Sequence, residues 1–193
     1  YSYKQINNLV DNLQNNKFVG KFITIIGKNS IYYFVLYLLC SKLNKTLVTL
    51  NHDANFEVIK DQIKNFKLNN IFCSIQLKIY LKKSLNSNFL NINKKNKIIF
   101  NNKKEKNKIF LLTFSSGSSN KPKPIAISEK TKIDRAIANI ESFKVKKRDK
   151  IIISTPLHHT LAIRLMTMGI LLGSEIIFME KYNLTNFLKL VKL

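Results

Sequence analysis

The chain has 193 residues, 45% of them hydrophobic, which is enough to bury a core and excludes a chain that is disordered throughout. Its 33 lysines and arginines against 11 aspartates and glutamates give a formal net charge of +22, which raises nucleic acid or an anionic membrane surface as a partner. The charge alone does not decide this, because joint enrichment in Lys, Asn and Ile is also what an AT-biased coding sequence produces.

The first part of the chain alternates between helical and strand patterns. Apolar residues at helical spacing predict amphipathic helices over residues 6–13 and 56–66. A third helix is predicted over residues 31–43, and either Asn29 or Ser30 can accept a hydrogen bond from its first free amides. The strands predicted here cover residues 22–26, 46–50 and 70–73.

The residue pattern gives little support for a membrane-spanning protein or a metal-binding protein. The longest apolar run, residues 31–40, is too short to cross a bilayer. Cys40 and Cys73 lie in separate apolar runs without Cys-x-x-Cys spacing, which predicts buried thiols, and the histidines form no metal-binding spacing with them. Without a recognisable secretory leader, the chain is interpreted as cytoplasmic.

Residues 91–108 form a dense basic run. We interpret it as a solvated connection between strands, with an RNA-binding or DNA-binding patch as the alternative. The phenylalanines that could stack on bases mostly fall where a core would need them, and no Lys/Arg-Gly-Phe pattern of an RNA-recognition module is present. These residues are Phe22, Phe34, Phe56, Phe66, Phe110 and Phe143. A nucleic-acid partner is therefore not expected.

The second part of the chain continues the alternation. Strands are predicted over residues 109–114, 125–127, 151–153 and 175–179, and helices over residues 133–143 and 161–172. An apolar helical pattern follows at residues 184–193. This alternation predicts an α/β fold with a largely parallel sheet flanked by helices. Ligands gather at the carboxyl ends of the strands in such sheets.

A serine-rich stretch at residues 115–124 joins two of these strands. Gly117 lets the backbone turn, the serines offer hydroxyl and amide donors, and Lys123 supplies a compact positive charge. Such nests of donors suit phosphate. The spacing fits neither a Walker loop nor a dinucleotide fingerprint, and a solvated serine-rich hairpin is the structural alternative. The serines are Ser115, Ser116, Ser118 and Ser119.

A second candidate lies in the loop that follows the strand at residues 151–153. It contains Pro156, Leu157, His158 and His159. Histidines at this position can serve a reaction, or they can cap or bridge the loop. The order and spacing after the serine-rich stretch favour the functional interpretation.

The serine-rich stretch resembles the phosphate-binding signature of the adenylate-forming superfamily (AMP-dependent acyl-CoA synthetases and acyl or aryl ligases), Thr-Ser-Gly-Ser/Thr-Thr-Gly-x-Pro-Lys-Gly. Ser115 to Ser119 take the first five positions, and Pro122 and Lys123 take the Pro-Lys. Asn120 stands in place of a Gly, and Pro124 replaces the last Gly, fixing φ and removing an N–H.

The histidine loop resembles the Pro-Leu-x-His motif of the same superfamily. On this alignment His159, not His158, takes the position beside the acyl-adenylate. The resemblance runs from near residue 1 to the last residues and implies that residues 1–193 are an incomplete N-terminal AMP-binding (adenylation) domain. The later motifs, the hinge and the C-terminal lid domain are absent from the sequence, so the chain is interpreted as a fragment that is inactive alone.

The implied function is ATP-dependent activation of a carboxylic acid to an acyl-adenylate, followed by transfer to a thiol, that of CoA or of a carrier protein. ATP, Mg²⁺ and CoA are the implied cofactors, and Lys123 and His159 the implied catalytic residues. Four residues, Leu161, Ala162, Leu165 and Met166, are expected in an apolar pocket wall. The implied phosphate-binding residues are Ser115, Ser116, Gly117, Ser118, Ser119, Asn120 and Lys123.

A second hypothesis is a non-catalytic relic of the same family that keeps the scaffold and some affinity for nucleotides. Pro124 and the missing later motifs favour it. A basic nucleic-acid-binding protein is a third class that depends on net charge alone.

Overall fold

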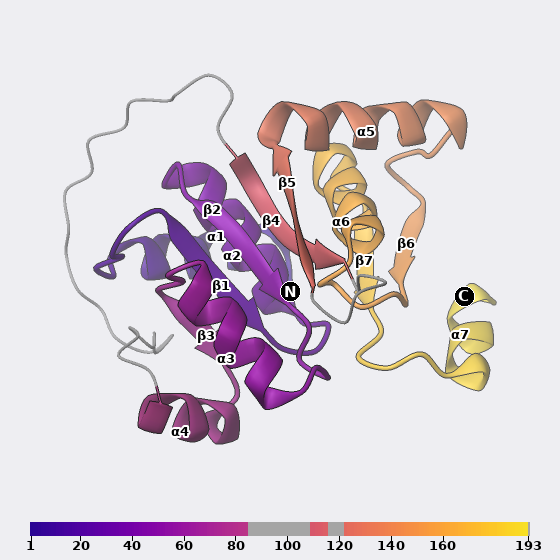
Figure 1. Cartoon of the computed structure of the whole chain (residues 1–193). Helices are drawn as coiled ribbons and strands as arrows, with labels where there is room; N and C mark the ends of the chain where they lie inside the picture. Colours follow the sequence, from indigo (N-terminus) through magenta and orange to yellow (C-terminus); the bar gives the residue numbers. More distant parts are fainter. Residues whose placement is uncertain (85–108, 116–121, 193) are drawn as a thin grey trace.

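The computed structural model describes residues 1–84, 109–115 and 122–192. Its helices and strands alternate along most of the chain (Figure 1). In chain order they are α1 (Tyr3–Gln14), β1 (Phe22–Ile26), α2 (Ile31–Lys42), β2 (Thr46–Leu50), α3 (Phe56–Asn65), β3 (Ile71–Cys73), α4 (Ile75–Ser84), β4 (Ile109–Ser115), β5 (Lys123–Ser128), α5 (Glu129–Ser142), β6 (Lys150–Ile153), α6 (Thr160–Leu172), β7 (Glu175–Phe178) and α7 (Leu184–Val191). None of the described helices is long and apolar enough to span a bilayer.

The described strands form two sheets. One has five strands in the order β3-β1-β2-β4-β5, in which β1 to β4 run parallel and β5 pairs antiparallel with β4. The other is a parallel pair, β6 and β7. The predicted α/β fold with a largely parallel sheet is therefore confirmed. The expected single sheet is divided in two, because β6 and β7 pair with each other and not with the first sheet.

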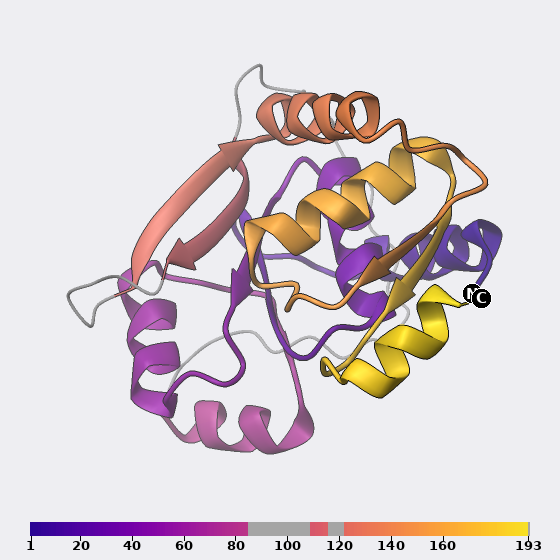
Figure 2. The same ribbon diagram turned by 90° about the vertical axis from the view of Figure 1, so that its right-hand side faces the viewer.

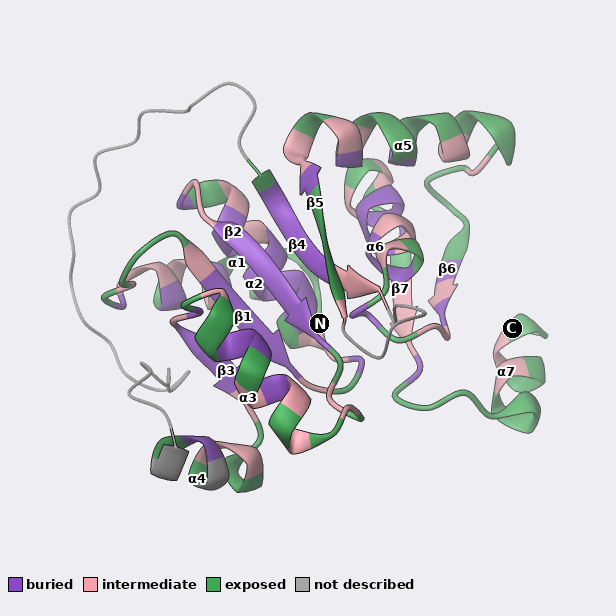
Figure 3. Cartoon of the chain, viewed as in Figure 1, coloured by how far each residue is buried: buried purple, intermediate pink, exposed green. Residues whose placement is uncertain are grey.

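Both faces of the five-stranded sheet are covered. On one face, α1 and α2 pack with Ile23, Leu47 and Leu111 in the larger apolar core, which α6 and β6 also join. On the other, α3 packs with Val48 and Leu112 in a smaller core. Alternate residues of β2 and β4 therefore serve opposite cores, so all of β2 and the middle of β4, residues 110–113, are buried (Figure 3).

The helix α2 is apolar around most of its circumference, because it lies inside the larger core. Its Tyr33 is fully buried and donates a hydrogen bond to the Gly27 carbonyl at 3.1 Å. Burial raises the pKa of the Tyr33 phenol well above its usual range, so this donor keeps its proton. One core expectation is wrong: Phe143, which caps the C-terminal end of α5, is 72% exposed.

The start of α2 also differs from the expectation. Ser30 is the N-cap residue, but its side chain makes no capping hydrogen bond within the described part of the chain. Asn29 instead binds the second sheet. Its Nδ2 donates to the Thr155 carbonyl at 3.0 Å and the Met179 carbonyl at 2.9 Å, and its Oδ1 accepts from the Leu157 amide at 2.6 Å. One buried amide thus joins the exits of β1, β6 and β7.

Replacing Asn29 with Ala should destabilise the fold, because it leaves two carbonyls and one amide without their side-chain partner. Each buried unsatisfied group costs about 1–3 kcal/mol. Urea unfolding should show the loss in the free energy of unfolding. The matched control is Asn7→Ala, which removes an exposed contact to Asp11 and should change stability by less than about 0.5 kcal/mol. Equal midpoints for the two variants would contradict the bridging role of Asn29.

The helix α6 packs very closely on the second sheet. A Cβ added at Gly169 would overlap Cγ1 and Cδ1 of Ile176 on β7. The Gly169 carbonyl also accepts a hydrogen bond of 2.9 Å from the Tyr3 hydroxyl on α1. Glycine at this position therefore allows α6 to lie directly on β7. Figure 2 shows α6 between α5 and the strands β6 and β7.

Gly169→Ala should lower the free energy of unfolding by about 1–3 kcal/mol, because a methyl group is forced into a packed contact. Thermal or urea unfolding measures the change. Gly27→Ala provides the comparison, since no described atom lies within 4 Å of the Cβ it would add. A Gly169→Ala protein as stable as Gly27→Ala would show that the contact between α6 and β7 relaxes freely.

Candidate active site

The candidate site lies where the two sheets meet at the carboxyl ends of their strands. The carbonyl of His158, in the loop after β6, accepts a hydrogen bond of 2.6 Å from the hydroxyl of Thr113 on β4. The hydroxyl of Thr49 on β2 donates to the same carbonyl at 3.4 Å. The histidine loop therefore crosses the ends of β2 and β4. This edge is where a parallel α/β sheet places its ligands.

The two ends of the serine-rich loop are held side by side at this edge. Ser115 is the last residue of β4 and pairs directly with Lys123, the first residue of β5. The prediction that the loop joins two strands is confirmed. Ser115 lies two residues beyond Thr113, so the loop begins beside the histidine loop. Its middle residues, Ser116, Gly117, Ser118, Ser119 and Asn120, lie outside the described residues.

Lys123 carries an exposed side chain at the start of β5. Among the described residues, no carboxylate pairs with it, whereas Lys130 on the following helix pairs with Asp134. Pro124, the most marked departure from the family signature, lies opposite Phe114 on the edge strand of the sheet. Edge strands tolerate proline, because a missing N–H there need not interrupt the ladder. The substitution is therefore compatible with the hairpin.

Three imidazoles form a row across this edge. The ring centroids of His52, which follows β2, and His158 are 6.3 Å apart, and those of His158 and His159 are 4.2 Å apart. His158 is buried at 6% exposure, whereas His159 is exposed at the N-cap of α6. Of these two adjacent histidines, His159 is thus the one that a ligand can reach, and the buried ring of His158 packs against it.

Burial is the main cause that lowers the pKa of His158 to about 4, and the neighbouring His159 and His52 lower it further. Asp53 acts in the opposite direction but does not compensate. His158 is therefore neutral at pH 7. The buried Nδ1 atoms of His158 and His52 have no hydrogen-bond partner among the described residues.

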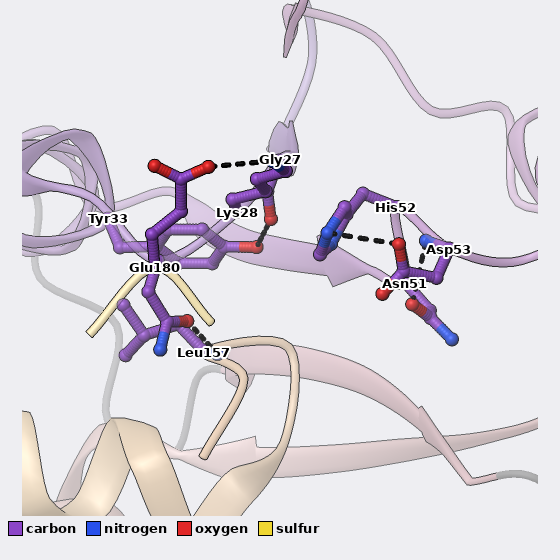
Figure 4. A network of polar contacts seen from close by, with 9 residues as sticks. Gly27, Lys28, Tyr33, Asn51, His52, Asp53, Leu157 and Glu180 are labelled. Carbon is purple, nitrogen blue, oxygen red and sulfur yellow. Dashed lines mark hydrogen bonds and ion pairs between the residues drawn. The ribbon is translucent and has the colours of Figure 1, made fainter. Parts of the chain in front are cut away.

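Two polar side-chain pairs border this row on the exits of β1 and β2. Lys28 and Glu180 form an ion pair of 2.6 Å between the exits of β1 and β7, and His52 lies 3.2 Å from Asp53 (Figure 4). The hydrogen bond to Glu180 raises the pKa of Lys28, and the same bond lowers the pKa of Glu180. Both side chains are largely exposed, so the pair orients the strand exits more than it stabilises the fold.

The expected apolar pocket wall is only partly at the surface. Ala162 and Met166 are fully buried and pack in the larger core, while Leu161 is 48% exposed. Leu165 is partly buried against the same core. Of these four residues, Leu161 is therefore the most accessible in the described structure.

Several residues of this edge were not identified from the sequence. Thr49 and Thr113 lie within apolar strand runs, and their hydroxyls bind a loop more than 40 residues further on. His52 lies two residues beyond the predicted strand at residues 46–50, so its place at a strand exit could have identified it.

A family model described as AMP-binding enzyme matches residues 2–192, and the chain therefore belongs to the AMP-binding enzyme family. The predicted resemblance is thus confirmed at the level of the family. In sequence, no curated protein matches the chain.

Solved structures show the same fold at low sequence identity. The o-succinylbenzoate CoA synthetase MenE of Bacillus subtilis, in complex with its acyl-adenylate intermediate, has a TM-score of 0.86 at 12% identity, over 98% of this chain and 52% of that chain. The N-terminal domain of FACL13 from Mycobacterium tuberculosis has a TM-score of 0.82 at 14% identity, over 98% and 52%. MatB from Rhodopseudomonas palustris has a TM-score of 0.82 at 13% identity, over 99% and 42%. The chain spans about half of these structures or less.

The imidazole of His158 should titrate with a midpoint near pH 4 in the folded protein, far below its ordinary value of 6.5. Between these values the unfolded chain binds a proton that the folded chain does not, so this group destabilises the fold as the pH falls from 6.5 to 4. NMR of the imidazole carbon-bound protons measures the midpoint. The urea-unfolded chain is the control, and a folded midpoint at 6 or above would contradict the burial of His158.

Proposed function

We propose that this chain provides the ATP-binding and carboxylate-binding edge of an adenylate-forming ligase. The observation that carries the proposal is the contact between Thr113 and the His158 carbonyl at 2.6 Å. It joins β4, the strand that leads into the serine-rich loop, to the loop that carries His159. A triphosphate held by the loop and a carboxylate held near His159 would then face each other across one strand end. Membership of the AMP-binding enzyme family supports this assignment.

In the first step, a carboxylate oxygen attacks the α-phosphate of ATP, pyrophosphate leaves, and an acyl-adenylate forms. The negative charges of the carboxylate and of the ATP phosphates repel each other, which opposes this step. The Lys123 ammonium, the serine hydroxyls and the amides of the loop would bind the β- and γ-phosphates and stabilise the charge that develops on pyrophosphate. Ser115 and Lys123 fit this task, because a hydroxyl donor and a cation stand side by side at the loop ends.

Mg²⁺ would accompany ATP and neutralise charge on its phosphate oxygens. Such a complex is known for a structural relative, since MenE has been solved with ATP and a magnesium ion at a TM-score of 0.86. In this chain the exposed Lys123 would share the neutralisation. His159 would contact the acyl end, and the buried His158 beside it is neutral at pH 7.

In the second step, a thiol displaces AMP from the acyl-adenylate and forms a thioester. We propose coenzyme A as the thiol, because relatives of this fold include CoA synthetases such as MenE. A carrier-protein thiol is the other acceptor that the chemistry permits. We further propose that residues 1–193 are the N-terminal part of the adenylation domain. The remainder of that domain and a lid domain would complete the reaction.

Lys123→Ala should abolish carboxylate-dependent exchange between ATP and pyrophosphate in the protein that contains this chain. Removing a well-placed charge donor costs about 2.7–4 kcal/mol in the transition state, a loss of about a hundredfold to a thousandfold in rate. The measurement is isotope exchange with a panel of aliphatic, aromatic and dicarboxylic acids. Lys130→Ala is the matched control, because Lys130 is exposed and paired with Asp134.

Unchanged exchange in Lys123→Ala would refute the role of Lys123. Binding of ATP to the purified chain, measured by calorimetry, separates the two family hypotheses. ATP binding that depends on Lys123, without exchange for any acid, would identify a non-catalytic nucleotide-binding relic. Absence of both would reject the proposed site.

A further inference from the structure

A buried lysine lies directly behind the histidine loop. Lys132, on the first half of α5, is only 2% exposed. Its Nζ donates a hydrogen bond of 3.0 Å to the carbonyl of Thr160, the residue that follows His159. An ammonium group has three N–H donors, and among the described residues this carbonyl is the acceptor that Lys132 contacts. The side chain therefore reaches across from α5 to the first turn of α6.

The surroundings of Lys132 are unfavourable for a cation. Burial lowers its pKa to about 7, and the positive charges of Arg164 on α6 and Arg135 on α5 act in the same direction. No carboxylate of the described residues pairs with any of these three. The buried Nε of Arg164 also lacks a hydrogen-bond partner within the described structure. An apolar side chain of similar length would pack here at lower cost, so stability alone does not account for a lysine.

The hydrogen bond from Lys132 to Thr160 is one of two that restrain the backbone around His159. The carbonyl before His159, that of His158, is held by Thr113 on β4 at 2.6 Å. The carbonyl after it, that of Thr160, is held by Lys132 on α5 at 3.0 Å. His159 begins α6, and its side chain makes no capping hydrogen bond within the described residues. Two long-range contacts thus fix the backbone on either side of an exposed imidazole.

The helix α5 follows β5 directly, and β5 begins at Lys123. Lys132 therefore connects the segment that leaves the serine-rich loop to the residue beside the proposed carboxylate site. We propose that Lys132 is a positioning residue for His159: it fixes the first turn of α6 and so holds the imidazole at the edge where β2 and β4 end. This inference rests on the proposed function for its catalytic consequence, whereas the placement of His159 can be tested without any activity.

The structural test compares Lys132→Met with the wild-type chain by NMR. Methionine keeps the length and the apolar stem but removes the donor and the charge. We expect the resonances of Thr160 and of the His159 imidazole to shift, while those of α1 and β1 stay unchanged. Lys130→Met, on the exposed side of the same helix, should leave both residues unchanged. Unchanged His159 resonances in a folded Lys132→Met protein would overturn the proposal.

A pH titration of the wild-type chain provides a measurement that needs no variant. The charged groups that face Lys132 are Arg135 on α5 and Arg164 on α6, and neither changes protonation near neutral pH. Loss of the proton from Lys132 near pH 7 weakens its bond to the Thr160 carbonyl, so the carbonyl carbon of Thr160 should show an inflection there. The inflection should vanish in Lys132→Met and persist in Lys130→Met. A Thr160 carbonyl that does not respond to pH in the wild type would overturn the proposed contact.

The catalytic consequence is tested by exchange between ATP and pyrophosphate in the protein that contains this chain. Lys132→Met should lower kcat by about tenfold to a hundredfold, because misplacing a contacting group costs that much, and should leave the KM for ATP within about twofold. An unchanged kcat would show that His159 does not need Lys132. Should the wild type show no exchange, the proposed function fails, and the NMR results alone decide whether Lys132 positions His159.

Discussion

The geometry of the whole edge depends on hydrogen bonds that tie the loop after β6 to the first sheet. The two sheets share no strand pairing in the described part of the chain, so their relative position comes from packing of α6 and from these polar contacts. Thr113 and Asn29 make most of these contacts. Thr113 binds the His158 carbonyl at 2.6 Å, and Asn29 binds three backbone groups at 2.6–3.0 Å. Because these hydrogen bonds are buried or partly buried and directed to backbone atoms, they specify one position of the loop, which nonspecific apolar packing would not do.

The sequence predicts the helices and strands far better than it predicts which residues contact one another across the fold. Strands β1 and β2 consist of apolar and threonine residues without charges because both faces of the sheet are covered, and such runs are recognisable within five residues. Helix α4 was missed, since Ile75 and Ile79 are exposed and its lysines interrupt the apolar period. The role of Asn29 could not be predicted, because its partners lie 126 to 150 residues further along the chain.

The candidate site shows the same contrast between local motifs, which the sequence reveals, and long-range contacts, which it does not. The serine-rich loop and His159 were identified because each is a local motif of fixed residue order, and the structure brings the described ends of that loop and the histidine loop to one edge. Lys132 was not identified. It stands between Thr131 and Ile133 in an ordinary helical pattern, where a lysine is expected to face solvent. Only the packing of α5 on α6 turns it inward, and packing of this kind is a tertiary property that no local pattern reports.

The high positive charge of the chain and its few fixed donors have different consequences for catalysis. A net charge of +22 attracts ATP and pyrophosphate alike, since both are polyanions, and an attraction that is equal before and after the chemical step cannot accelerate it. Rate enhancement requires donors placed where charge develops during the step. Under the proposed function, such donors in this chain would be the groups whose position is set by the fold. The backbone of Lys123 is paired with Ser115 at the hairpin end, and His159 lies between two restrained carbonyls. Under the proposed function, the many solvated lysines would raise the local concentration of nucleotide, whereas the placement of Lys123 and His159 would determine whether a bound nucleotide reacts.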